Sequence, residues 1–258
     1  MLLSSVRLIG NKSSIFFGTV GHLSLFVFKS IIGMFSRPLY FNIILRQLLI
    51  IGYNSLPVIA MTAIFSGAVL ALQSYTGFSR FSAESSIATV VVLSITRELG
   101  PVLAGLMVAG RVGASIAAEI GTMRVTEQID ALYVLSTNPI KYLVVPRVIA
   151  SVISLPCLVF VGDIIGVMGG YFVSVYKLGF NSSSYIISTA EHLESIDVIS
   201  GLVKAAAFGF IIAIMSSYYG YYSDKGAKGV GSATTSAVVS SSIIILISNY
   251  LITEIFFS

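Results

Sequence analysis

The sequence predicts an all-α integral membrane protein with five transmembrane helices, an N-terminal interfacial helix and a short helix on the cytoplasmic side. Charged residues make up only 10% of the 258 residues, against roughly 25% in ordinary soluble domains. The hydrophobic share is 56% and the mean hydropathy is +0.96. A soluble domain needs far more charge on its surface. This composition excludes a typical soluble enzyme, a disordered chain and a nucleic-acid binder.

Uncharged runs place the membrane spans, since a spanning helix needs about 20 mainly apolar residues. Gln47–Ser79, Ala205–Ser223 and Gly229–Thr253 carry no charged residue. Two further apolar stretches hold a few charges each. The predicted division is a cytoplasmic N-terminus with the interfacial helix over 1–46, then a five-helix membrane domain over 47–258. Its spans are 48–75, 86–118, 148–176, 199–222 and 233–255.

Residues 15–35 form an apolar segment that is ambiguous between two arrangements. Its apolar residues recur at helical spacing, among them Val20, Leu23, Val27 and Ile31, and basic residues follow. This pattern is typical of a helix lying in the membrane interface. A sixth span is the alternative.

The distribution of Lys and Arg predicts the orientation, because basic residues concentrate on the cytoplasmic side. Residues 1–46 contain five basic and no acidic residues. The loops over 119–147 and 223–232 add five more on the same side, whereas the opposite loops hold only Arg80 and Lys177. The N-terminus is therefore expected inside and the C-terminus outside.

The second span contains ionisable residues that an apolar helix does not need. Arg97 and Glu98 precede Pro101, and a charge within a span costs about 2.5–3.5 kcal/mol on insertion scales. Such residues either line a polar substrate path or form ion pairs that hold helices together. Pro101 should weaken the helix locally. Asp163 in the third span is either protonated, paired with Arg111, or a substrate contact.

Small residues at four-residue spacing predict close helix contacts, because lipid supplies no hydrophobic force between helices. The stripes pack either within one subunit or at a dimer seam. Their helix-packing glycines are Gly105 and Gly113 in the second span and Gly162, Gly166 and Gly170 in the third.

The sequence contains few of the residues that a catalytic or metal-binding site requires. Cys157 is the single cysteine, and the two histidines are His22 and His192, so we predict neither a catalytic group nor a metal site. Gly226–Gly231 fails the GxxxxGK[ST] pattern of a phosphate loop. It is interpreted as a flexible cytoplasmic turn.

The loop after the second span predicts a short amphipathic helix over 119–135. Ile129, Leu132 and Tyr133 share one face, and charged residues occupy the rest. Asn138-Pro139 should end it. Such a helix either docks on a soluble motor subunit or is a solvated connector.

Several long motifs resemble those of the MlaE-type permeases, the membrane subunits of ABC transporters linked to MCE proteins. They are Ser94–Val102 (SITRELGPV), Ala109–Leu132 (AGRVGASIAAEIGTMRVTEQIDAL) and Asn138-Pro139, with support from Ile153–Pro156 and Gly229–Val238. The resemblance implies a five-span subunit that works as a homodimer.

The resemblance also implies partners and site residues. An ABC ATPase would bind the cytoplasmic coupling helix, an MCE-domain protein would sit outside, and phospholipid would be the substrate. Arg97 and Glu98 would be polar positions of the lipid path, with Leu70 and Tyr75 in its apolar wall. The implied ATPase-coupling residues are Glu119, Gly121, Arg124, Glu127, Asp130 and Leu132.

The resulting hypothesis is a non-enzymatic permease subunit of an ABC transporter in the bacterial inner membrane. It moves phospholipid between envelope membranes, binds no cofactor itself, and uses ATP only through its partner. The alternative is a stand-alone secondary transporter or an intramembrane scaffold. We see no internal repeat of the kind common in secondary transporters. The direction of transport and the lipid species stay open.

Overall fold

The computed structural model describes residues 2–81 and 86–257, and this part of the chain is helical without any β-strand. Short 3₁₀ and π segments (η) connect or interrupt the α-helices. In chain order the elements are α1 Leu2–Phe35, α2 Phe41–Ile51, η1 Tyr53–Ser55, α3 Leu56–Phe78, η2 Ser79–Phe81, α4 Ile87–Ser94, η4 Ile95–Leu99, α5 Gly100–Val108, η5 Ala109–Gly113, α6 Ala114–Val125, α7 Gln128–Val134, η6 Ile140–Val144, α8 Val145–Phe172, η7 Val173–Lys177, α9 Ser182–His192, α10 Ser195–Tyr221 and α11 Gly226–Phe257.

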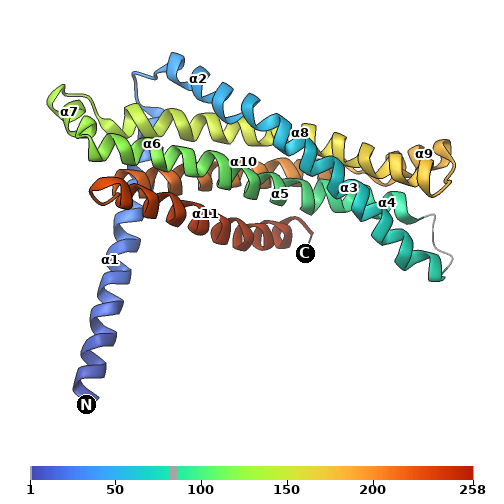
Figure 1. Cartoon of the computed structure of the whole chain (residues 1–258), viewed down its shortest axis with the longest axis horizontal. Coiled ribbons are helices and arrows are strands. Elements are labelled where there is room, and N and C mark those ends of the chain that lie inside the picture. Colours follow the sequence, from blue (N-terminus) through green and yellow to red (C-terminus); the bar gives the residue numbers. More distant parts are fainter. Residues whose placement is uncertain (1, 82–85, 258) are drawn as a thin grey trace.

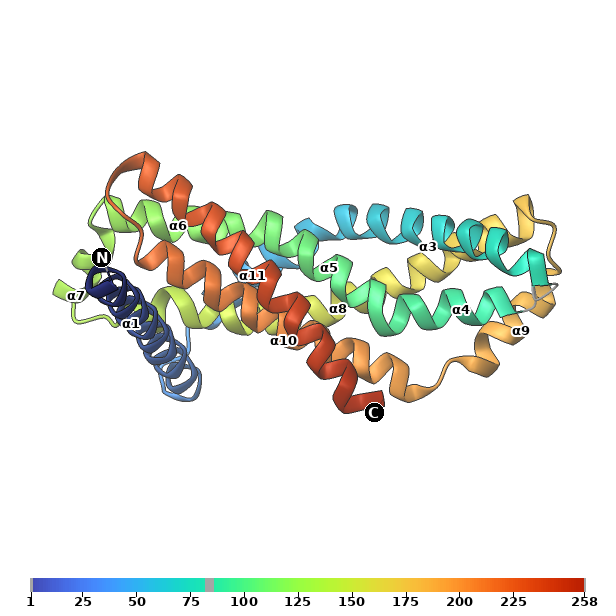
Figure 2. The ribbon, with the colours of Figure 1, turned by 90° about the horizontal axis from the view of Figure 1, so that it is seen from below.

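The helices form an elongated bundle in which the long helices run lengthwise (Figure 1). One end carries α7 and the α10–α11 turn, and the other carries α9, the end of α3 and the start of α4 (Figures 1 and 2). We call these the α7 end and the α9 end. Within the described residues, six helical stretches are long and apolar enough to cross a membrane. The prediction of an all-α membrane protein is therefore confirmed, whereas helix length alone does not yield a count of five.

The stretch beyond the five predicted spans is the N-terminal one, Phe17–Phe35 within α1, which was predicted to lie in the interface. α1 crosses the bundle at its α7 end: it is steep in Figure 1 and foreshortened in Figure 2, while the other long helices stay lengthwise. Phe26 anchors it, with its ring centroid 5.6 Å from that of Tyr218 and 5.9 Å from that of Tyr221. α1 is thus packed on the bundle without running parallel to it.

Two helical stretches run past the spans predicted within them. The span 86–118 lies in the stretch Ile87–Val125, apart from residue 86, and the span 48–75 lies in Phe41–Phe78, which has a short 3₁₀ break at Tyr53–Ser55. The charge-free criterion stops at Glu119, but that carboxylate pairs with Arg147 at 2.8 Å and the helix continues. The turn predicted over Gly226–Gly231 was wrong, because these residues are the first turns of α11.

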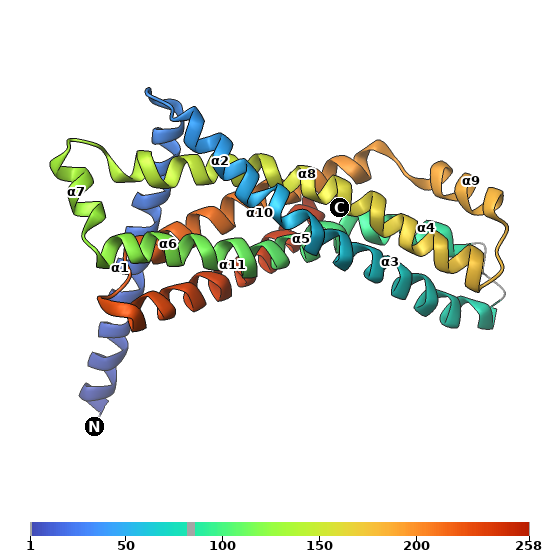
Figure 3. The ribbon, with the colours of Figure 1, turned by 45° about the horizontal axis from the view of Figure 1, so that its top comes forward.

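The cytoplasmic helix predicted over 119–135 is two helices instead of one. Residues up to Val125 belong to α6, and α7 begins at Gln128. Glu127 between them has a φ of 60°, which is a left-handed conformation that an α-helix does not contain. The chain therefore turns sharply, and α7 folds back at the tip of the bundle (Figure 3).

α8 is the central helix, and glycines bring its neighbours close. A Cβ on Gly67 of α3 would collide with the backbone of Gly166, and one on Gly169 would collide with the backbone of Ile64. Gly162 faces Ile59 of α3, and Gly170 lies beside Val91 and the Gly67 carbonyl. The predicted glycine stripe of the third span therefore lies at a contact within one subunit.

The glycines of the second span face α10. A Cβ on Gly105 would lie 3.1 Å from the ring of Phe208, and one on Gly113 would lie 2.9 Å from the Ser216 hydroxyl oxygen. Packing at this distance gives α5 and η5 their dispersion contacts with α10 in a solvent that supplies no hydrophobic force between helices.

Gly67→Ala should destabilise the fold by about 1–3 kcal/mol, as overpacked cores do, because the new methyl group has no room against Gly166. Gly77→Ala is the matched control in the same helix, since its methyl group meets no atom within 4 Å. The melting temperature of the purified chain in detergent measures both. Equal melting temperatures for the two variants would contradict the packing assigned to Gly67.

Candidate functional site

Arg97 of η4 forms an ion pair with Asp197 of α10. The Arg97 Nε donates to Asp197 Oδ1 at 2.6 Å, and Asp197 is fully buried. Its other oxygen, Oδ2, accepts from the backbone N–H of Glu194 at 3.0 Å, within a capping box that begins α10. The Arg97 guanidinium also lies 4.4 Å from the ring centroid of Phe257, near the end of α11.

Glu98 has a separate set of partners. Lys204 Nζ, completely buried in α10, donates to Glu98 Oε1 at 2.8 Å. From α11, Asn249 Nδ2 donates to Oε2 at 2.8 Å and Thr253 Oγ1 donates to Oε1 at 2.9 Å. Neighbouring charges on one helical segment therefore have different partners, because successive side chains point in different directions around the helix.

Pro101 contributes to the same cluster through the hydrogen bond that it cannot make. A proline has no N–H to donate to the carbonyl four residues earlier, which here belongs to Arg97. Lys204 Nζ donates to that carbonyl oxygen at 2.7 Å. The residues before Pro101 form the π-helical segment Ile95–Leu99 instead of a regular α-helix. The ionic cluster of Arg97, Glu98, Asp197, Lys204, Asn249 and Thr253 thus joins the second span to α10 and α11.

Four members of this ionic cluster were not predicted from the sequence. Lys204 is the one charged residue of the predicted span 199–222, and a buried lysine needs an anion. That signal was present in the sequence. Asp197, Asn249 and Thr253 carried no comparable signal, because Asp197 lies outside the predicted span and the other two side chains are uncharged.

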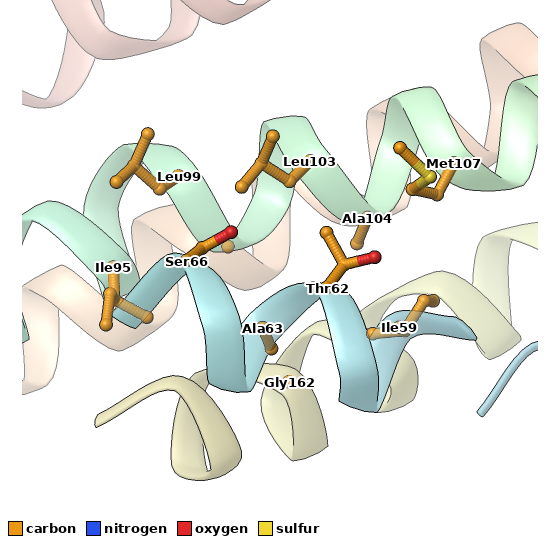
Figure 4. A pocket seen from close by; sticks show the side chains of 11 residues that line it. Ile59, Thr62, Ala63, Ser66, Ile95, Leu99, Leu103, Ala104, Met107 and Gly162 are labelled. Atoms are coloured by element: carbon orange, nitrogen blue, oxygen red, sulfur yellow. The ribbon is translucent and has the colours of Figure 1, made fainter. Parts of the chain in front are cut away.

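A second feature is an apolar groove between α3 and the π-interrupted second span. Figure 4 shows side chains of α3 and of η4–α5 facing each other across it. The groove is lined by Ile59, Thr62, Ala63, Ser66, Ile95, Leu99, Gly100, Leu103, Ala104, Met107 and Gly162. It continues along Phe65, Ser66, Val69, Leu70, Gln73, Leu99 and Leu103, where its volume is about 430 Å³.

The four predicted lipid-path residues do not lie together in one site of the structure. Leu70 lines the groove. Tyr75 packs nearby, with its ring centroid 5.9 Å from that of Phe180. Arg97 and Glu98 are absent from the described lining of the groove, and their charged groups contact α10 and α11. η4 thus presents Leu99 to the groove and its two charges to the ionic cluster, and the role of all four residues stays a prediction.

Asp163 of α8 does not pair with Arg111. The Arg111 Nη1 donates to Ser55 Oγ at 2.7 Å. Asp163 is buried beside Gly100, and its Oδ1 has no hydrogen-bond partner among the described residues. Of the three alternatives for Asp163, the Arg111 pair is therefore excluded in this conformation.

The predicted ATPase-coupling residues lie at the α7 end. Arg124 Nη1 pairs with Asp130 Oδ1 at 2.8 Å across the α6–α7 turn. Gly121 faces Ser223 and Val230 at the base of α11, and Leu132 packs against the core. Tyr133 Oη is hydrogen-bonded to Tyr221 Oη at 2.8 Å.

The tip of α7 exposes apolar side chains. Val134 is 85% exposed and Leu135 is 72% exposed, whereas Ile129 on the same helix is completely buried. α7 is therefore anchored by one face and presents its C-terminal end outward. Within the described residues, no group of three or more His, Cys, Asp or Glu side chains is placed to hold a metal ion.

The fold and these three features define the class: a multi-pass, all-helical membrane protein with a lateral apolar groove, a partly buried ionic cluster and a projecting helix. Comparison with known proteins is specific. The Permease MlaE family model matches residues 44–255. The chain is 73% identical to a probable ABC transporter permease protein of Rickettsia felis, over all of this chain and 99% of the relative.

More distant relatives agree. A probable ABC transporter permease protein of Synechocystis is 44% identical over 83% of this chain and 81% of its own length. The intermembrane phospholipid transport system permease protein MlaE of Haemophilus influenzae is 33% identical over all of this chain and 99% of its own length. The chain belongs to the MlaE permease family.

Lys204→Met should destabilise the protein by up to about 3–5 kcal/mol, the cost of leaving a paired charge alone in a low dielectric. Because Glu98 is partly exposed, we expect a destabilisation at the lower end of this range. Adding Glu98→Gln should recover most of the loss, because the unpaired charge is then gone. Lys177→Met is the control, since Lys177 is exposed and makes no ion pair within the described residues. Melting temperatures in detergent provide the measurement, and a double variant no more stable than Lys204→Met would refute the pairing.

Proposed function

We propose that this chain is the permease subunit of an ABC transporter that moves phospholipid between the membranes of a bacterial envelope. The observation that carries the proposal is the full-length match to the MlaE permease of Haemophilus influenzae, whose name states phospholipid transport. The apolar groove between α3 and α5 supports it physically. The chain has no phosphate-binding GxxxxGK[ST] sequence, so ATP hydrolysis belongs to a separate ATPase subunit and this chain holds no cofactor.

In this proposal, five stretches cross the inner membrane and α1 lies in the interface. The crosswise direction of α1 supports that arrangement, because a helix nearly perpendicular to the spans runs along the membrane plane (Figure 1). Residues 1–46 then form the cytoplasmic segment and 47–258 the permease domain. Ten of the 15 basic residues lie in segments at the α7 end, which makes that end cytoplasmic. The N-terminus is inside and the C-terminus outside.

α7 is the proposed docking point for the ATPase. Its Arg124–Asp130 ion pair and the left-handed Glu127 hold the turn that projects it. The exposed Val134 and Leu135 offer the apolar centre that a stable interface needs. Movement of a docked ATPase would therefore act first on the inner ends of α6 and η6.

The groove between α3 and α5 is the proposed lipid path. Its lining is almost entirely apolar, which suits acyl chains, and Thr62, Ser66 and Gln73 supply its few polar groups. Phe65 and Val69 on its α3 side are more than half exposed. A second copy of the chain facing this side would close the groove into a cavity, and an MCE-domain protein at the α9 end would receive or deliver the lipid. Arg97 and Glu98, in the neighbouring ionic cluster, would interact electrostatically with the lipid headgroup.

Val134→Glu should abolish docking of the ATPase, because a charge at the apolar centre of an interface is costly to bury. Copurification of the ATPase in mild detergent should fall about tenfold or more, the effect of losing a hot-spot residue. Ile186→Glu is the matched control, an exposed apolar residue on α9 at the other end. Undiminished copurification with Val134→Glu would remove α7 from the interface.

Ser66→Trp should block lipid transfer, because an indole ring placed between Leu99 and Leu103 fills the groove. Transfer of fluorescent phospholipid by the reconstituted complex should fall about tenfold or more if access limits the rate, while ATPase copurification persists. Ile153→Trp, at an exposed position on α8 away from the described groove, is the control. Equal transfer by the two variants would exclude the groove as the path.

A further inference from the structure

A second cavity lies nearer the α7 end, between α2 and the inner half of the second span. It has a volume of about 170 Å³ and is lined by Gln47, Ile50, Ile51, Arg111, Val112, Ser115, Ile116 and Glu119. A water molecule occupies about 30 Å³ in the liquid, so the cavity is large enough for a polar headgroup and far too small for a whole lipid. No residue lining it also lines the groove described above.

Arg111 is the cation of this cavity, and its charge is not neutralised. It belongs to the membrane-crossing stretch Ile87–Val125, and its recorded hydrogen bond goes to the Ser55 hydroxyl. Three other cations of the bundle behave differently: Arg97, Arg147 and Lys204 each contact a carboxylate at 2.6–2.8 Å. No carboxylate of the described residues lies within ion-pair distance of Arg111.

Gln47 adds an independent observation. Its side chain is 94% buried, as its exposed fraction is only 6%, and it lines the cavity. Its amide makes no hydrogen bond within the described part of the chain, and its nitrogen and oxygen are not among the completely buried polar atoms. The residue is thus almost entirely enclosed, while its amide keeps contact with the accessible space of the cavity and is free to bind a ligand.

The nearby carboxylate does not fill this role. Glu119 lies eight residues beyond Arg111 on the same helical stretch, and its Oε2 already accepts from Arg147 Nη2 at 2.8 Å. The cavity therefore offers a guanidinium, an amide and the Ser115 hydroxyl, with its one carboxylate occupied. This donor set fits a phosphate, which guanidinium groups bind through two parallel hydrogen bonds.

The cavity opens to the outside of the bundle. Ile50, Arg111, Ser115 and Glu119 in its lining are all exposed. Around a membrane-crossing stretch the outside is lipid, and this part of the stretch lies in the half nearer the α7 end. We propose that Arg111 and Gln47 bind the phosphate of a glycerophospholipid from the leaflet at the α7 end, at a site separate from the groove.

Photocrosslinking tests lipid occupancy directly. A diazirine-bearing amino acid replaces Ile50 in the full chain, purified in maltoside micelles with its copurifying subunits. The probes are phosphatidylglycerol and the diacylglycerol with the same acyl chains, which lacks the phosphate. Mass spectrometry of the labelled peptide should find about tenfold more phosphatidylglycerol adduct, the value of a charge-assisted hydrogen bond. Equal labelling by both lipids would overturn the proposal.

Variants then assign the contact to the two residues. Arg111→Gln should lower the phosphatidylglycerol adduct to the diacylglycerol level, and Arg111→Lys should retain an intermediate amount. Gln47→Leu, which keeps the cation, should lower the adduct a few-fold. Arg46→Gln is the matched control, because Arg46 is an exposed cation on α2 outside the cavity lining. Melting temperatures identify any variant that loses adduct by unfolding, and adduct that persists in folded Arg111→Gln would overturn the proposal.

Two further measurements in the same crosslinking experiment test whether free phosphate or a second copy of the chain fills the cavity instead of lipid. Excess inorganic phosphate should leave the lipid adduct unchanged, since the acyl chains contribute to binding; full displacement would assign the site to free phosphate and overturn the lipid proposal. A crosslink to a peptide of a second copy would place Arg111 at a subunit contact and also overturn it. The readout needs neither ATP nor transport, so its failure would leave the proposed function untouched, and loss of transport would leave this site untouched.

Discussion

Burial of charge in a low dielectric is the constraint on which the rest of this structure depends. The second span carries Arg97 and Glu98 at a depth where an unpaired charge is costly. Both are paired by α10, and Glu98 also by α11. Because one π-helical segment supplies both charges, its position fixes where α10 and α11 pack. The glycines at 105 and 113 then let these helices approach closely enough for the ion pairs to form.

The same segment also shapes the groove. Pro101 prevents a regular α-helical hydrogen bond to the Arg97 carbonyl, and Lys204 uses that carbonyl instead. The wider π turn before it places Leu99 against α3 while the charges point to α10 and α11. The five residues Ile95–Leu99 therefore contribute to the ionic cluster on one side of the helix and to the apolar groove on the other. The proposed lipid path and the ionic cluster thus share one backbone segment, although their side chains differ.

Much of this fold follows from sequence periodicity and charge. The low charge fraction and the uncharged runs suffice for an all-helical membrane protein, and the glycine spacing predicts close helix contacts without naming the partner helix. Other features depend on tertiary geometry that local sequence does not encode. The partners of Arg97 and Glu98 lie about a hundred residues or more away, and the break at Glu127 requires a left-handed backbone that glutamate rarely adopts. The groove lies between α3 and α5, and close glycine contacts hold α3 against α8, an arrangement that no single segment reveals.

The aromatic anchor of α1 connects parts of the molecule that are far apart in sequence. Phe26 packs on Tyr218 and Tyr221, and the Tyr221 hydroxyl is bonded to Tyr133 of α7. Three helices therefore meet in one joint made of rings. The ring of Tyr221 contacts Phe26 of α1, and its hydroxyl group contacts Tyr133 of α7. One buried side chain of α10 therefore fixes the position of both the crosswise helix and the projecting helix.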